Sequence, residues 1–331
     1  MTKFTVTRRS LLGASAGGAL GLLAKPNLAK AASYATQPVR LFVGTAAAGT
    51  VDLVARLLSP TFRDMLGQPV LVENRPGAAT TLAAGLVANA KPDGHTLLVS
   101  SSAALAVHVA SATKPTHLIN DLTHVGMACD GGFIYAIHKD VPAKNYAEFV
   151  ALLQQQPGKF RYGATGIGGN IHLSGALFCL NTGTRMVAVQ YANAGMRANE
   201  LLSNQTQLGI GGGAVLGQHI RSGMLNGLFV ASEKRDALFP DLPTSVELGI
   251  PGMQNITNWV ALHGPKGMPA EIVQQLSQVL QVALAKPEVV SGLAASGLFT
   301  TPGTPEALIE RMKVDYAVMA DVAKRGDIRI D

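Results

Sequence analysis

Two glycine-rich turns are the stretches of this sequence best suited to binding chemistry, because each can present free backbone amides to an anion. The first lies between an apolar run at residues 41–43 and a helical pattern that starts near Thr50, the predicted N-cap. Amides at a helix start carry the positive end of the helix dipole and bind anions. The ordinary alternative is a plain strand-to-helix turn whose acidic residue complements the dipole. The candidate ligand-binding residues of this turn are Ala46, Ala47, Ala48, Gly49 and Asp52.

The second turn has the same design and lies between a strand pattern at residues 161–164 and an amphipathic helix that starts at residue 170. One such turn is a weak signal, since glycines also serve tight turns. Two of them, in a chain long enough for two lobes, predict a carboxylate held between two helix N-termini. The candidate residues here are Ala164, Thr165, Gly166, Gly168, Gly169, Asn170 and His172.

Three ring-bearing side chains lie in or beyond these stretches. His172, one turn into the second helix, either faces the cleft or caps the glycine-rich turn, and the residues favour neither interpretation. Tyr191 is interpreted as lining the cleft. Trp259, the only tryptophan, is predicted to fill the core.

The motifs of common catalytic and metal sites are absent from the sequence. After residue 32 it contains no Gly-x-Ser-x-Gly elbow, and it nowhere contains His-Glu-x-x-His or Cys-x-x-Cys. Its 8 histidines are scattered without metal-ligand spacing. Residues 209–214 (GIGGGA) fit a dinucleotide fingerprint only loosely, and we discount that interpretation. The sequence therefore predicts no catalytic residue, no metal and no cofactor.

The first 32 residues predict an export signal rather than part of the fold. Arg8 and Arg9 form a twin-arginine pattern, a weakly apolar run covers residues 11–24, and Ala29 and Ala31 mark a cleavage site. That run is shorter than the ~20 apolar residues needed to cross a bilayer. We therefore expect a periplasmic protein exported by the twin-arginine route.

The charge balance changes when this leader is removed, because the leader carries five basic residues and no acid. The 27 Lys and Arg of the whole chain then become 22, against 21 Asp and Glu. A nearly neutral protein gives no electrostatic reason to expect nucleic acid or an anionic membrane as partner. Cys129 and Cys179 are interpreted as free thiols, and a disulfide between them is the alternative in an oxidising compartment.

Apolar runs alternate with helical patterns through most of the mature chain, which is typical of α/β lobes with helix-covered sheets. Expected strands include residues 70–73, 96–100, 125–129, 133–137, 186–190, 207–210, 225–231 and 259–263. Three helical patterns with proline at their starts close the sequence, and such a tail usually returns to the first lobe. We predict a first lobe at 33–129, a second at 130–257, a helical return at 258–331, and a hinge near Cys129 and Asn258.

A series of ordered motifs makes the chain resemble the substrate-binding proteins of tripartite tricarboxylate transporters, the Bug receptors. The resemblance runs from about residue 38 to the C-terminus. Its motifs are 67–78 (GQPVLVENRPGA), 91–98 (KPDGHTLL), 156–160 (QPGKF), 166–172 (GIGGNIH), 220–223 (IRSG), 242–249 (LPTSVELG) and the segment from 259 to 269.

The resemblance implies a two-lobed, type II-like periplasmic-binding-protein fold that closes on a small carboxylated solute. In the family, the loop after the first strand and the facing glycine-rich loop hold a ligand carboxylate. These correspond to residues 46–52 and 164–172, the two turns described above. The implied partners are membrane permease subunits, and we expect a monomer.

This chain departs from the family pattern at residues that bear on specificity. The methyl group of Ala48 narrows the approach to the first loop, and Ala164 and Gly169 replace common serines. After Tyr191, Ala192 and Asn193 replace the usual basic residue and glycine, so Ala192 is expected at the cleft without a cation. These changes favour a monocarboxylate. The rival functions are an orphan sensor and an exported enzyme on the same scaffold.

Overall fold

The computed structural model describes residues 34–47, 49–77, 81–104 and 120–329, and residues 34–331 form one compact unit. The predicted leader and Ala48 lie outside the described residues. Two sheets organise the unit, one with six strands and one with five. The α/β, two-lobed fold class is confirmed.

The first sheet has the order β11-β4-β10-β3-β1-β2. β1 pairs in parallel with β2 and β3, whereas β10 runs antiparallel to both β3 and β4. The strands are β1 (Val39–Val43), β2 (Val70–Asn74), β3 (Thr96–Ser101), β4 (Leu122–Asp130), β10 (Val260–Pro265) and β11 (Phe299–Thr300).

Alternating side chains of β1 feed two separate cores, because neighbouring residues of a strand point to opposite faces. Leu41 and Val43 pack in a cluster with α1 (Thr50–Leu66), α8 (Ala270–Leu284) and α9 (Pro287–Ala294). Phe42 belongs to a second cluster, which includes α2 (Thr81–Ala88) and extends into the other lobe. The first sheet is thus covered by helices on both faces.

The second sheet has the order β7-β6-β8-β5-β9 and forms the other lobe. β6 is parallel to β7 and β8, and β5 is antiparallel to β8 and β9. The strands are β5 (Phe133–His138), β6 (Arg161–Thr165), β7 (Val187–Tyr191), β8 (Leu208–Gly211) and β9 (Leu225–Ala231). The helices are α4 (Tyr146–Gln155), α5 (Asn170–Thr182), α6 (Ala194–Leu202), α7 (Gly213–Arg221) and the 3₁₀ turn η2 (Met253–Asn255).

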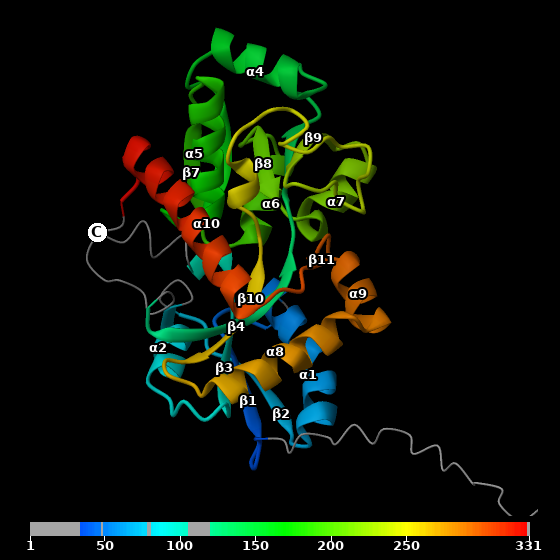
Figure 1. The fold of residues 1–331 in the computed structure, drawn as a ribbon. Helices are drawn as coiled ribbons and strands as arrows, with labels where there is room; N and C mark the ends of the chain where they lie inside the picture. The colour runs from blue at the N-terminus through cyan, green and yellow to red at the C-terminus, as the bar shows by residue number, and fades with distance from the viewer. Residues whose placement is uncertain (1–33, 48, 78–80, 105–119, 330–331) are drawn as a thin grey trace, which may run out of the picture. The chain divides into compact units, whose positions relative to one another are not determined.

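The C-terminal tail is not all helical, contrary to the sequence prediction. The short strand β11 pairs with the end of β4, and two residues are too few to show a periodic pattern. α10 (Pro305–Arg325) contacts β4 of the first sheet and α5 beside the second sheet (Figure 1). The sequence also predicts no helix at α7, whose first two residues belong to the loose dinucleotide motif at 209–214.

The chain crosses between the sheets twice, at residues 131–132 and again at 256–259. The two crossing segments are hydrogen-bonded, since the amide of Asn258 donates to the carbonyl of Gly131 at 2.9 Å. A methyl group at Gly132 would lie 2.4 Å from Cγ1 of Val230, so this crossing passes where only glycine fits. The predicted lobe boundaries and the hinge stay predictions.

Candidate ligand-binding site

A cavity of about 240 Å³ lies where segments from both sheets meet, and it is the candidate ligand-binding site. The first lobe contributes Thr50, and the segment after α9 contributes Ser296. The second lobe contributes Thr165 and the start of α5. Asn258 of the return crossing completes the polar part of the wall. The residues that line the cavity therefore lie mainly at the ends of helices and strands rather than in their middles.

Four helices begin at this cavity. Each of them follows a strand directly or after a short turn, so the helix starts gather at the carboxyl ends of the strands. Their aligned dipoles place partial positive charge at the cavity. The lining residues within these first turns are Thr50 of α1, Asn170 of α5, Ala194 of α6 and Ala214 of α7.

Arg197, on the second turn of α6, adds a full positive charge to the same cavity. Its stem packs on β6, because a methyl group at Gly163 would lie 2.5 Å from its Cγ. Its guanidinium lies beside β8, where a methyl group at Gly211 would be 3.4 Å from Nη2. The residue is only 6% exposed, and its Nη1 is buried without a hydrogen-bond partner among the described residues. Desolvation lowers the pKa of Arg197 to about 10, so the group stays charged at neutral pH.

The family model for the "Tripartite tricarboxylate transporter family receptor" matches residues 54–310 of this chain. The chain belongs to this family. Protein BugT of Bordetella pertussis (strain Tohama I) is 32% identical over 276 residues, which cover 83% of this receptor and 84% of BugT. The match confirms the resemblance to Bug receptors that the sequence motifs indicate.

Solved structures of related proteins share the receptor's fold. The periplasmic binding protein BugD superposes with a TM-score of 0.74 at 29% identity and covers 89% of this chain and 99% of its own. An R. palustris protein solved with adipate gives a TM-score of 0.77 at 26% identity, and covers 89% of this chain and 98% of its own. The receptor therefore has the fold of a periplasmic binding protein.

Among the described residues of the first glycine-rich turn and its helix start, Thr50 lines the cavity, whereas Ala46, Ala47, Gly49 and Asp52 do not. Gly49 is the N-cap of α1, so the prediction that Thr50 caps the helix is wrong by one residue. Ala46 and Ala47 are exposed, and Ala48 lies outside the described residues. A β-carbon at Gly49 would lie 3.4 Å from the carbonyl oxygen of Ala46, so the turn is tight.

Asp52, in the same first turn, has partners within its own lobe. It is 3% exposed and accepts a hydrogen bond from Nδ2 of Asn74 at 2.9 Å. Nε of Arg56 lies 3.0 Å from its other carboxylate oxygen. These contacts tie the start of α1 to the end of β2. The predicted ligand contact of Asp52 stays a prediction.

The second glycine-rich turn is closer to the prediction, because Thr165 and Asn170 both line the cavity. Gly166 and Gly168 have φ angles of 76° and 71°, the left-handed conformation that favours glycine. At Gly169 a β-carbon would lie 2.6 Å from the carbonyl oxygen of Thr165. Ala164 is fully buried one residue before the end of β6. The glycines therefore shape the turn that delivers Thr165 and Asn170.

His172 caps this turn. Its Nδ1 accepts a hydrogen bond from the amide of Gly168 at 3.1 Å, and its ring lies 6.4 Å from that of Tyr162. It lines a different surface pocket, together with Cys179 and Arg325. Burial lowers the pKa of His172, which keeps it neutral as an acceptor. The structure shows the capping contact, and the predicted ligand contact of His172 stays a prediction.

Tyr191 and Ala192 lie at the edge of the second sheet, at the end of β7. The Tyr191 ring is near the Arg197 stem, since a methyl group at Gly163 would contact both. Ala192 is exposed, whereas Ala194 and Arg197 line the cavity. Trp259 is fully buried in the core, as predicted. The cysteines are free, with Cys129 buried and Cys179 half-buried.

Sequence reasoning missed several residues of the cavity wall. Arg197 stands between helix-forming residues and carries no motif, so the sequence gives no sign that it is buried. Gly211 and Gly212 belong to the run that was discounted as a nucleotide fingerprint. This run is a third glycine-rich turn between a strand and a helix, and that pattern is the signal that the sequence offers for these two residues.

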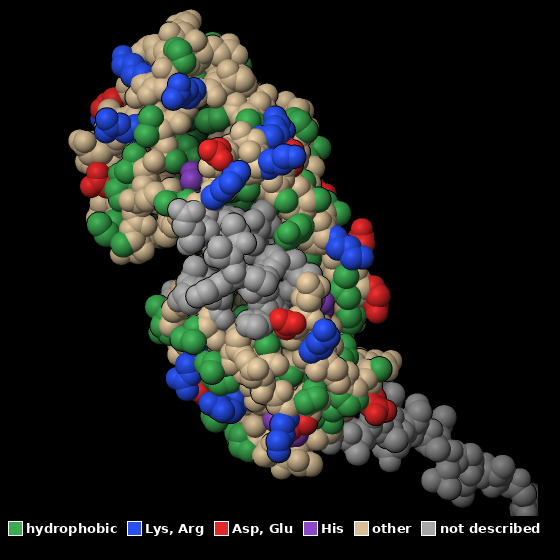
Figure 2. Space-filling view, turned by 90° about the vertical axis from the view of Figure 1, so that its left-hand side faces the viewer, with side chains coloured by type: hydrophobic (Ala, Val, Ile, Leu, Met, Phe, Trp, Pro, Cys, Tyr) green, Lys and Arg blue, Asp and Glu red, His purple; other side chains and the backbone are tan. Residues whose placement is uncertain are grey.

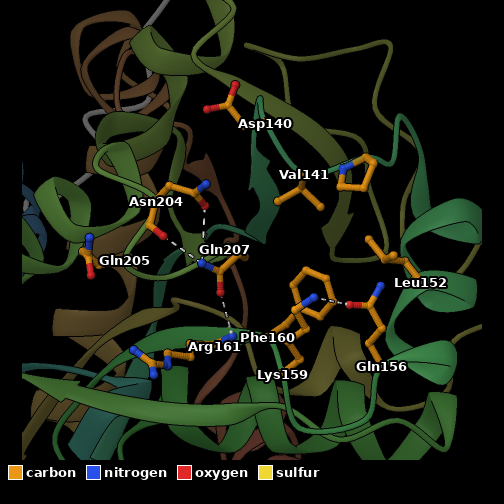
Figure 3. A pocket seen from close by; sticks show the side chains of 11 residues that line it. Asp140, Val141, Leu152, Gln156, Lys159, Phe160, Arg161, Asn204, Gln205 and Gln207 are labelled. Carbon is orange, nitrogen blue, oxygen red and sulfur yellow. Dashed lines mark hydrogen bonds between the residues drawn. The ribbon is translucent and has the colours of Figure 1, made fainter.

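A second pocket lies far from these turns, beside β6 and the end of α6 (Figure 3). It contains cations, but several of its polar side chains have partners nearby. Lys159 donates to Gln156 at 2.6 Å, and Gln207 binds both the carbonyl of Asn204 and the amide of Arg161. Asp140 also lines it and opposes an anion. The pocket at the helix starts is therefore the better anion site.

The described residues hold no group of three or more His, Cys, Asp and Glu placed to bind a metal ion. Within the same residues no helix is long and apolar enough to span a membrane. Lys and Arg side chains alternate with Asp and Glu over the described part of the face shown in Figure 2.

Proposed function

We propose that this protein is a periplasmic receptor that captures a small organic carboxylate between its lobes and delivers it to membrane permease subunits of a tripartite carrier. The observation that carries the proposal is the convergence of four helix N-termini on one cavity in a member of this receptor family. Such a site binds an anion through amides and dipoles and needs no nucleophile. The adipate found in the R. palustris relative supports a carboxylate as ligand.

The proposal extends to export, domain motion and assembly. Residues 1–32 direct twin-arginine export and are removed, and the mature receptor is a monomer. The lobes at 33–129 with 258–331 and at 130–257 close by rotation at the two crossings. The ligand contacts are the first-turn residues of α1 and the segment from Thr165 to Asn170.

Mass spectrometry of the protein purified under native conditions tests the ligand class. We expect a retained carboxylic acid that is displaced on unfolding. A thermal-shift screen against mono-, di- and tricarboxylates provides the affinity ranking, since a ligand at 100 times its dissociation constant stabilises the fold by ~2.7 kcal/mol. Stabilisation by no carboxylate would contradict the proposal. Chemical turnover of a bound acid would favour an exported enzyme instead.

Cell fractionation tests export. The full chain is expected in the periplasm, and Arg8→Lys combined with Arg9→Lys should retain it in the cytoplasm. Unchanged periplasmic yield of the double variant would show that another route exports the protein. Co-purification of the closed, ligand-bound form with membrane permease subunits distinguishes a transporter receptor from a free-standing sensor.

A further inference from the structure

Arg197 is a buried cation without a counter-charge in its surroundings. Its guanidinium lies between β6 and β8 at the cavity wall, and the described residues that line this cavity include no Asp or Glu. Arg311 shows the usual arrangement for such a group in this chain, since it pairs with both Asp130 and Asp315. A buried charge that lacks a partner is costly, so proteins retain one mainly where a ligand supplies the partner.

The direction of the guanidinium agrees with such a ligand. The Arg197 stem is fixed against Gly163, and Nη2 lies near Gly211, a residue that lines the cavity itself. Nη1 is enclosed by the protein and has no hydrogen-bond partner among the described residues, so the donors that a ligand in the cavity can reach are Nε and Nη2. A planar guanidinium held in this way offers parallel N–H donors that match the two oxygens of a carboxylate.

The rest of the described wall carries no formal charge. Thr50, Thr165, Asn170, Asn258 and Ser296 supply hydroxyl and amide groups, and Phe133 supplies an apolar surface. Neutral hydrogen-bonding groups suit hydroxyl, carbonyl or amide substituents. One cation balances one carboxylate and leaves a second without a charged partner.

We propose that Arg197 is the charged anchor of the ligand's carboxylate, and that the receptor takes a small organic acid with one carboxylate and an uncharged remainder. This inference rests on the proposed function and names the residue and the charge class within it. It moves the main ionic contact from the predicted glycine-rich loops to the second turn of α6. The helix N-termini then add dipoles around the same anion.

Titration of matched probe pairs tests the anchor. The probes are benzoate, nicotinate and butyrate, their uncharged amides, and adipate as a dicarboxylate. The variants are Arg197→Met, which keeps the length of the side chain without its charge, and Arg197→Lys, which keeps the charge without the fork. Arg161→Met is the control, because it removes an exposed cation of the same lobe from the pocket of Figure 3.

The native receptor should bind at least one monocarboxylate more tightly than both its amide and adipate. Arg197→Met should weaken that acid about 10- to 100-fold and leave the amide unchanged, so the acid-to-amide ratio collapses. Arg197→Lys should bind with intermediate affinity, and Arg161→Met like the native protein. The melting temperature of ligand-free Arg197→Met should be equal or higher, because a buried unpaired charge is gone.

The outcomes separate the two levels of the proposal. Binding of no carboxylate by the native protein removes the proposed function. If the native protein binds a carboxylate and Arg197→Met keeps the same ratio of acid affinity to amide affinity, the proposal that Arg197 is the anchor is wrong. The proposed receptor function then stands. A tenfold loss in Arg161→Met instead assigns the ligand to the pocket of Figure 3. Tighter native binding of adipate than of each monocarboxylate contradicts the single-charge class.

Discussion

Nε1 of Trp259 donates a hydrogen bond to Oδ2 of Asp315 at 2.8 Å, and so joins the start of β10 to the middle of α10. Both side chains are fully buried. Arg311 binds the same carboxylate at 2.8 Å and reaches Asp130 at the end of β4 at 3.1 Å. It also donates to Oγ1 of Thr257 at 2.9 Å. One guanidinium on α10 therefore holds both segments through which the chain crosses between the sheets.

Replacing Arg311 with methionine should lower the free energy of unfolding at pH 8 by about 3 kcal/mol, because Asp130 and Asp315 lose the cation that pairs with both. Arg325→Met is the matched control on the same helix, since Arg325 pairs with Asp321 at the surface. We expect that control to change stability by less than about 1 kcal/mol. Urea unfolding measures the free energy of unfolding of both variants. Equal losses in the two variants would show that the buried network contributes no more to stability than a surface pair.

The titration of Asp315 should make stability fall as the pH rises. Burial raises the pKa of Asp315 from 3.8 to about 7, against the opposing effect of Arg311. The native state then binds a proton more tightly than the unfolded chain between about pH 4 and 7, so this contribution to stability is lost across that window. We expect the unfolding free energy of the native protein to fall relative to Asp315→Asn by about 1 kcal/mol or more between pH 5 and 8. A constant difference would mean that Arg311 keeps Asp315 ionised throughout.

The sequence predicts the fold well because each element carries its own local signal. The strand expected at residues 225–231, for example, is β9 with the same bounds. β11 has two residues and forms only because β4 lies beside it, so no local sequence pattern predicts this strand.

The site is harder to predict, because burial and pairing are properties of the folded chain. Thr165 and Asn170 were found from glycines that mark a strand-to-helix turn. The sequence does not indicate Arg197 as a site residue, since an arginine inside a helical pattern is ordinarily exposed to solvent. Only the packing of its stem against Gly163 makes it a buried cation. The sequence therefore predicts the glycine-rich turns but not the buried charge of Arg197.

His172 should stabilise the glycine-rich turn by accepting from Gly168. His172→Phe keeps a ring beside Tyr162 but leaves the Gly168 amide without its acceptor, which should cost about 1 to 2 kcal/mol. Burial lowers the pKa of His172 below its usual 6.5, so the histidine's contribution is present above pH 6.5 and is lost as the pH falls. The stability gap to His172→Phe should therefore narrow between pH 7 and 5. A gap that widens on acidification would contradict the neutral acceptor.

Cys129 and Cys179 should titrate as two thiols in denaturant without a reductant, because both are free in the structure. In the native protein Cys129 should react far more slowly than Cys179, since full burial raises the pKa of its thiol and shields it. Mass spectrometry after alkylation for increasing times identifies which of the two thiols reacts first. Recovery of no thiol before reduction would establish a disulfide instead.

Ala192→Arg tests whether the residue after β7 sets charge specificity. The family pattern has a basic residue there, and a cation at the cleft would favour ligands with a second carboxylate. In the structure Ala192 is exposed, whereas Arg197 is buried at the cavity wall. An exposed cation is screened by water and salt, so its pairing with a ligand charge is worth little.

We expect the affinity ratio of benzoate to adipate to change by less than about threefold in Ala192→Arg. The same ratio should fall much further in Arg197→Met, because benzoate loses its anchor there. Side-by-side calorimetric titrations of the two variants provide the comparison. A large shift of Ala192→Arg toward adipate, with Arg197→Met unchanged, would restore Ala192 as the specificity wall and remove Arg197 from the site.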